Sequence, residues 1–75
     1  MIHPTKHIPA EQTLLGAGAV IFYELSRPRT VTGLWETVRE ARTIGTFERF
    51  VLALTMLYSL QVVRFEGGLV MRGTS

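Results

Sequence analysis

The chain contains no cysteine, no aspartate and no asparagine, and these absences exclude several kinds of chemistry. Without cysteine it can form no disulfide, no thiolate nucleophile and no cysteine-based metal site. Its serines, Ser26, Ser59 and Ser75, have no histidine near them in the sequence, and its glutamates are scattered rather than paired. It also lacks a glycine-lysine phosphate loop. We therefore expect a non-catalytic protein without a cofactor.

Histidine occurs only near the N-terminus, at His3 and His7. In a helix these two side chains would stand one turn apart, but Pro4 opposes a helix there. Because no third ligand lies nearby in the sequence, we expect no metal site. Residues 1–9, which end at Pro9, are predicted to form an N-terminal arm.

Long hydrophobic runs are missing as well. The two longest uncharged stretches, residues 12–23 and 50–63, are both too short to cross a bilayer, and the N-terminus lacks the apolar run of a secretory signal. We therefore expect no membrane partner and a cytoplasmic location. Yet 47% of the 75 residues are hydrophobic and the mean hydropathy is +0.24. A single domain of this size and composition favours a subunit of a complex over a free monomer.

Charge of one sign is not concentrated anywhere in the chain. The net charge is +2, and glutamates are interspersed among the basic residues, which are arginine except for Lys6. A mild basic excess without a basic run permits nucleic acid as a partner but does not indicate it.

Residues 46–60 are predicted to form the helix around which the rest of the chain is organised. Thr46 can cap this helix, and Glu48 suits the positive end of its dipole. The helical period places one set of apolar residues on the face that we expect in the core, namely Phe47, Phe50, Val51, Leu54, Leu57 and Tyr58. The opposite face carries Leu52, Ala53, Met56 and Leu60, broken by Arg49, and a polar seam of Glu48, Thr55 and Ser59 separates the two. Either the same small fold or a partner covers this second face.

Two further helices are predicted before it, over residues 10–26 and 30–42. In the first, Gly16 and Gly18 lower the helix propensity, so we expect a neighbouring backbone to approach closely. In the second, Thr30 is the expected cap, and the inward stripe comprises Val31, Leu34, Trp35, Val38 and Ala41. A short glycine-bearing turn at residues 43–45 then gives a helix-turn-helix pattern.

Residues 61–72 are predicted to form a β-hairpin around two adjacent glycines. A three-residue loop at residues 66–68 would pair Phe65 with Leu69 and Val63 with Met71, which gathers four apolar side chains on one face. Three helices followed by a two-stranded wing define a mostly helical α+β fold, the winged helix-turn-helix. We assign residues 10–72 to this domain and residues 73–75 to a tail.

Several short motifs, in this order, resemble one known family. They are Pro4-Thr5-Lys6-His7, Leu14-Leu15-Gly16, Arg27-Pro28-Arg29-Thr30, Leu34-Trp35, the run from Phe50 to Leu54, and Leu57-Tyr58. Together they are similar to the small middle components of bacterial ABC three-component systems, most closely to middle component 6. Gly33 and Gln61 depart from the family pattern, which favours a glutamate and a glycine at these positions.

The resemblance implies a winged-helix adaptor subunit. Such an adaptor would work with an SMC-like ABC ATPase of the chromosome-maintenance or double-strand-repair kind and with an effector-type third component, in conflict with phage or plasmids. The family supplies no catalytic residues.

Two hypotheses for the binding surface follow from the residues. An adaptor would use the apolar outward side of the central helix together with the arm, and the candidate interface residues are Lys6, His7, Leu52, Met56 and Leu60. Self-association through such a surface is also possible. The alternative is a DNA-binding protein with weak, sequence-independent backbone contacts, for which the candidate residues are Arg27, Arg29, Arg64 and Arg72.

Overall fold

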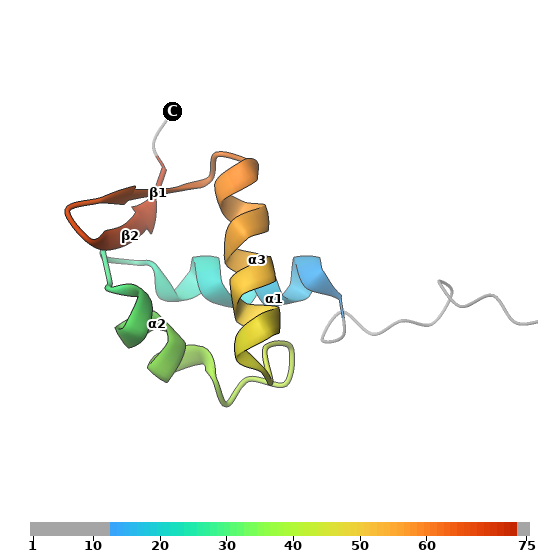
Figure 1. Cartoon of the computed structure of the whole chain (residues 1–75). Coiled ribbons are helices and arrows are strands. Elements are labelled where there is room, and N and C mark those ends of the chain that lie inside the picture. The colour runs from blue at the N-terminus through green and yellow to red at the C-terminus, as the bar shows by residue number, and fades with distance from the viewer. Residues whose placement is uncertain (1–12, 74–75) are drawn as a thin grey trace, which may run out of the picture.

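The computed structural model describes residues 13–73 of the chain. In that part three helices, α1 (Leu14–Glu24), α2 (Val31–Val38) and α3 (Phe47–Ser59), precede an antiparallel hairpin of β1 (Val63–Glu66) and β2 (Leu69–Arg72). Figure 1 shows α3 crossing α1, with α2 and the hairpin on the same side of α3. This mostly helical α+β fold confirms the predicted class and is consistent with a winged-helix layout, so we call the hairpin the wing. The predicted division into arm, domain and tail stays a prediction.

A threonine caps the N-terminus of each of the three helices. The hydroxyls of Thr13, Thr30 and Thr46 accept hydrogen bonds of 2.9–3.1 Å from the backbone N–H groups three residues further on. The first helix therefore begins later than the predicted residue 10. The second ends at Val38 rather than residue 42, because the chain turns there to carry Ile44 into the core.

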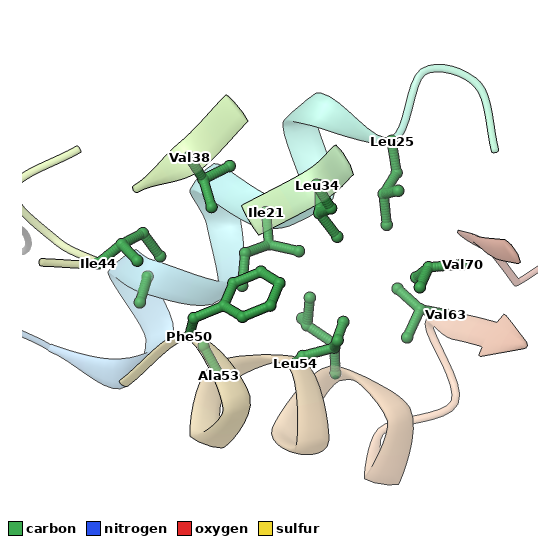
Figure 2. Packing of buried hydrophobic residues seen from close by; sticks show 12 residues of the cluster. Ile21, Leu25, Leu34, Val38, Ile44, Phe50, Ala53, Leu54, Val63 and Val70 are labelled. Atoms are coloured by element: carbon green, nitrogen blue, oxygen red, sulfur yellow. The ribbon is translucent and has the colours of Figure 1, made fainter. Parts of the chain in front are cut away.

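The core lies where the three helices and the wing converge. It contains Ala17, Ile21, Leu25, Leu34, Val38, Ile44, Phe50, Ala53, Leu54, Leu57, Val63 and Val70. Figure 2 shows Phe50 beside Ile21 of α1, with Val63 and Val70 of the wing closing one end. The predicted inward stripe of the second helix is confirmed, and Trp35 packs against the core as a half-buried residue.

The predicted faces of α3 need a correction. Ala53, which we assigned to the outward face, is fully buried, whereas Phe47, Val51 and Tyr58 of the predicted core stripe are 42–54% exposed. The centre of burial lies opposite the polar seam, because the fold turns that seam towards solvent. Apolar residues consequently remain exposed on both flanks of the helix.

Gly18 lies where α1 packs tightly against α3. The neighbour is not a backbone, as predicted, but a pair of side chains. A methyl group added at Gly18 would lie 2.7 Å from Cε of Met56 and 3.2 Å from Cδ2 of Leu57. Met56 is therefore half-buried against α1, although we had placed it on the outward face.

The wing also differs from the prediction, since its loop has two residues rather than three. Phe65 pairs with Val70, and Glu66 pairs with Leu69. Gly67 and Gly68 both have positive φ, at 57° and 80°, as a type I′ turn requires. The apolar pattern misled the prediction because only Val63 and Val70 enter the core, while Phe65 stays 46% exposed.

Two connections fix the wing to the helices. The backbone of Arg29 exchanges hydrogen bonds of 2.9 and 2.7 Å with that of Val70, so the α1–α2 linker borders β2. After α3, the N–H of Val62 donates to the carbonyl of Leu57 over 3.1 Å, in a Schellman motif. Gln61 takes the left-handed position of this motif with φ 64°, a conformation that glycine adopts more readily than other residues.

We expect Leu54→Ala to lower the free energy of unfolding by about 2–5 kcal/mol, because Leu54 is 7% exposed and its loss leaves a cavity in the core. Chemical denaturation followed by circular dichroism measures this change. The matched control is Leu52→Ala, at a 57% exposed position of the same helix, which should cost less than about 1 kcal/mol. Equal losses for the two variants would contradict the assigned faces of α3.

Candidate protein-interaction surface

The exposed apolar side chains of α3 continue onto the wing and form one surface. We call it the α3–wing surface, and its members are Phe47, Val51, Leu52, Tyr58 and Phe65, each 42–57% exposed. Scattered apolar residues are normal on a protein surface, but a contiguous row with aromatic members is typical of an interaction site.

Aromatic contacts hold both ends of this surface in place. Phe47 packs edge-on against Trp35 of α2, with ring centroids 5.2 Å apart, and Phe50 supports it from the core at 5.7 Å. At the other end, Tyr58 packs against Phe65 of the wing at 5.5 Å. Side chains ordered in advance lose little conformational entropy when a partner covers them.

A shallow hollow of about 270 Å³ lies between α3, the start of α2 and the wing. Its lining is apolar apart from the hydroxyl-bearing Thr55 and Tyr58 and comprises Val31, Phe50, Val51, Leu54, Thr55, Tyr58 and Phe65. No charged residue contributes to it. Such a hollow suits an apolar side chain of a protein partner.

The charges of α3 point to the same chemistry. Glu48 is exposed beside Phe47, Val51 and Leu52 of the α3–wing surface, and the other charged residue of the helix, Arg49, is turned inward. Its Nε donates to the carbonyl of Thr43 over 2.6 Å and its Nη2 to the carbonyl of Thr13 over 2.8 Å. The exposed side of α3 therefore presents a carboxylate and no cation, which disfavours contact with phosphate.

The predicted interface residues do not form one patch in the structure. Leu52 is 57% exposed on the α3–wing surface, and Leu60 is 58% exposed at the other end of α3, beside α1. Met56 lies between them, half-buried against Gly18. Lys6 and His7 lie outside the described residues.

Most of the arginines proposed as phosphate contacts are engaged within the domain. Arg72 donates through Nε and Nη2 to the carbonyl of Phe22 over 3.1 and 3.0 Å, and its guanidinium lies 4.4 Å from the centre of the Phe22 ring. Arg29 donates to the carbonyl of Glu24 over 2.6 Å. These two cations thus donate to carbonyls at the C-terminus of α1, where the helix dipole favours positive charge.

The other two candidates differ from one another. Arg64 forms an ion pair with Glu66 at 3.5 Å on the wing. Arg27 is exposed and makes no hydrogen bond or ion pair with the residues that the structure describes. Of the four predicted phosphate contacts, Arg27 is therefore the one that makes no polar contact with a described residue.

Within residues 13–73 the structure shows neither a cluster of metal ligands nor a membrane-spanning helix. That part of the chain contains no group of three side chains able to hold a metal ion, while His3 and His7 lie outside it. None of its helices is long and apolar enough to cross a membrane.

Sequence reasoning missed Phe47, Val51 and Tyr58 as surface residues, although one signal was present. The predicted stripe was centred too close to Val51 and Tyr58, whereas the structure buries the sector around Phe50, Ala53 and Leu57. The polar seam of Glu48, Thr55 and Ser59 marked the solvent side more reliably. No pattern in the sequence indicated that Phe65 would join them from the wing.

The fold and this surface define a class of small, mostly helical domain with a wing, whose third helix presents apolar and aromatic groups instead of cations. The family model for middle component 6 of ABC three-component systems matches residues 3–72, so the chain belongs to this family. No curated protein and no solved structure gives a significant match.

We expect Arg72→Gln to lower the free energy of unfolding by about 1 kcal/mol, because the charged hydrogen bonds from the wing to the end of α1 are lost. Thermal unfolding measures the shift. The matched control is Arg27→Gln, the same change of charge at an exposed position, which should stay within about 0.5 kcal/mol of the parent. If the two variants melt alike, Arg72 does not hold the wing on α1.

Proposed function

We propose that this chain is a non-catalytic adaptor subunit that binds its partners through the α3–wing surface. In this proposal it bridges an SMC-like ABC ATPase of the chromosome-maintenance or double-strand-repair kind and an effector-type component, within a bacterial system that acts against phage or plasmids. Membership of the middle-component family supports a role beside the other components of such a system. The observation that carries the proposal is the exposed, uncharged row on α3 and the wing.

The energetics of that row favour a protein partner. Burying a large apolar side chain is worth about 1.5–3 kcal/mol relative to leaving it in water. Aromatic residues in the centre of an interface contribute most of the binding energy, and both Phe47 and Tyr58 are already ordered by ring contacts. An apolar side chain on a partner helix or strand would fill the hollow. A basic residue on the same partner segment would pair with the neighbouring Glu48.

DNA binding is the alternative, and the charges support it less. A helix that reads the major groove presents polar and basic groups, whereas the exposed side of α3 presents apolar groups and Glu48. Arg29, Arg64 and Arg72 would also have to leave contacts within the domain to reach phosphate.

We expect Leu52→Glu to leave the fold intact and to weaken capture of the other two components at least about tenfold, because a carboxylate would replace a large apolar side chain at the contact and would have to be desolvated there. The three components are co-expressed, the complex is recovered through a tag on the ATPase, and the variant alone is melted in parallel. Leu52 suits this test better than Met56, which packs against α1.

The matched control for this pull-down is Ser26→Glu, which adds the same charge at an exposed position of the α1–α2 linker. It should be captured like the parent chain. A folded Leu52→Glu variant that assembles as well as Ser26→Glu would place the contact with these components elsewhere.

We expect any affinity of the isolated chain for duplex DNA to be weak, about 10⁻⁴–10⁻⁶ M at physiological salt, and indifferent to sequence. Fluorescence anisotropy with several labelled duplexes over a range of salt concentrations measures it. Tight binding to one defined duplex would favour the DNA-binding alternative.

A further inference from the structure

We infer that two copies of this chain form a two-fold symmetric dimer through the outer face of α1. The contact would centre on a stripe of three exposed residues, Leu15, Ala19 and Tyr23, which we call the α1 stripe. The inference is independent of the proposed adaptor role, because the α1 stripe shares no residue with the α3–wing surface.

The α1 stripe is the least covered apolar surface of the described domain. Leu15 is 68% exposed and Tyr23 is 77% exposed, the two highest values among its large hydrophobic residues. Spaced four residues apart, the three side chains form one ridge along the helix. The opposite side of α1 carries Ala17, Gly18 and Ile21, which are buried.

The order of residues along the stripe matches the symmetry of a dimer. Because α1 runs over Leu14–Glu24, Ala19 is its central residue, with Leu15 and Tyr23 at equal distances on either side. A two-fold axis through Ala19 would lay the two helices antiparallel and place Leu15 of one copy against Tyr23 of the other. The small side chain at the crossing point allows the helix axes to approach to about 8 Å. A different partner would not require this symmetry.

The charges also favour a second copy. Within α1 the single charged residue is Glu24, at its C-terminal end, and Glu24 already pairs with Arg29 at 3.8 Å. A surface without charges meets no like-charge repulsion when it contacts its own copy. In an antiparallel pair, moreover, the dipoles of the two helices oppose one another.

The surface extends beyond the stripe towards the end of α3. An apolar hollow of about 280 Å³ adjoins it, lined by Leu15, Gly18, Ala19, Phe22, Leu57, Leu60 and Val62. A stable interface buries about 800 Å² on each partner, which one short helix does not provide alone. Leu60, at 58% exposed, and Val62, at 36%, supply the flank of the contact.

This dimer would leave the α3–wing surface free. Met56, which is half-buried, packs against Gly18, so this flank of α3 faces α1. Tyr58 contacts Phe65 of the wing on the other flank. The assembly would thus present two copies of the α3–wing surface, and two adaptors would hold two copies of each partner that binds there.

The test uses the full chain in sedimentation-velocity experiments between about 1 and 300 μM. We expect the parent to convert from monomer to dimer within this range. Ala19→Arg should reduce the association constant at least a hundredfold, because it places two guanidinium groups at the two-fold axis. The matched control is Thr55→Arg, on the polar seam of α3, which should dimerise like the parent.

A second variant keeps the test decisive if Ala19→Arg fails to fold. Since the chain has no cysteine, Ala19→Cys introduces a single thiol at the proposed axis. Mild oxidation should join two copies efficiently, because close helix axes bring the two Cα atoms within disulfide range. Thr55→Cys should cross-link poorly under the same conditions.

Three outcomes would overturn the inference. The first is a parent chain that stays monomeric at 300 μM. The second is a dimer that Thr55→Arg disrupts and Ala19→Arg does not, which would assign self-association to the α3–wing surface. The third is a dimer in which Ala19→Cys fails to cross-link. Each outcome is distinct from failure of the adaptor proposal, which the Leu52→Glu pull-down tests separately.

Discussion

The close packing of α3 on α1 at Gly18 is the contact on which the rest of the structure depends. Because position 18 has no side chain, Met56 and Leu57 of α3 can approach α1 until a single methyl group would collide with them. This approach brings Phe50 onto Ile21, and both side chains are fully buried there. α2 and the wing then close the two open sides of that pair.

A domain of this size has few residues with which to cover a central helix. The fold buries one sector of α3, around Phe50, Ala53 and Leu57, and turns the polar seam to solvent. The sectors on either side of the buried one stay apolar and partly exposed. Exposed apolar groups on both flanks are thus a consequence of placing a hydrophobic helix in a small fold. One flank belongs to the surface proposed here for partners, and Leu60 at the end of the helix adjoins the contact proposed for a second copy.

Arginine serves the fold more than the surface. Arg29 and Arg72 donate to carbonyls at the end of α1, and Arg49 holds the start of α1 to the loop before α3. Each guanidinium reaches backbone carbonyls, which an apolar side chain cannot bind, and charged donors of this kind form the stronger hydrogen bonds. A mildly basic composition therefore says little about nucleic acid when the cations are used internally.

The sequence by itself determined the order of the elements, the caps at Thr30 and Thr46, and the inward stripe of α2, because caps and helical periodicity depend on neighbouring residues. The tertiary structure alone decided which apolar residues of α3 are covered, since helical spacing does not say where α1 lies. It also decided the register of the wing, because the positive φ angles of Gly67 and Gly68 outweighed the apolar pattern. The exposed surface shared by Tyr58 and Phe65 exists only because the wing folds back on α3, a contact between distant segments that no local pattern encodes.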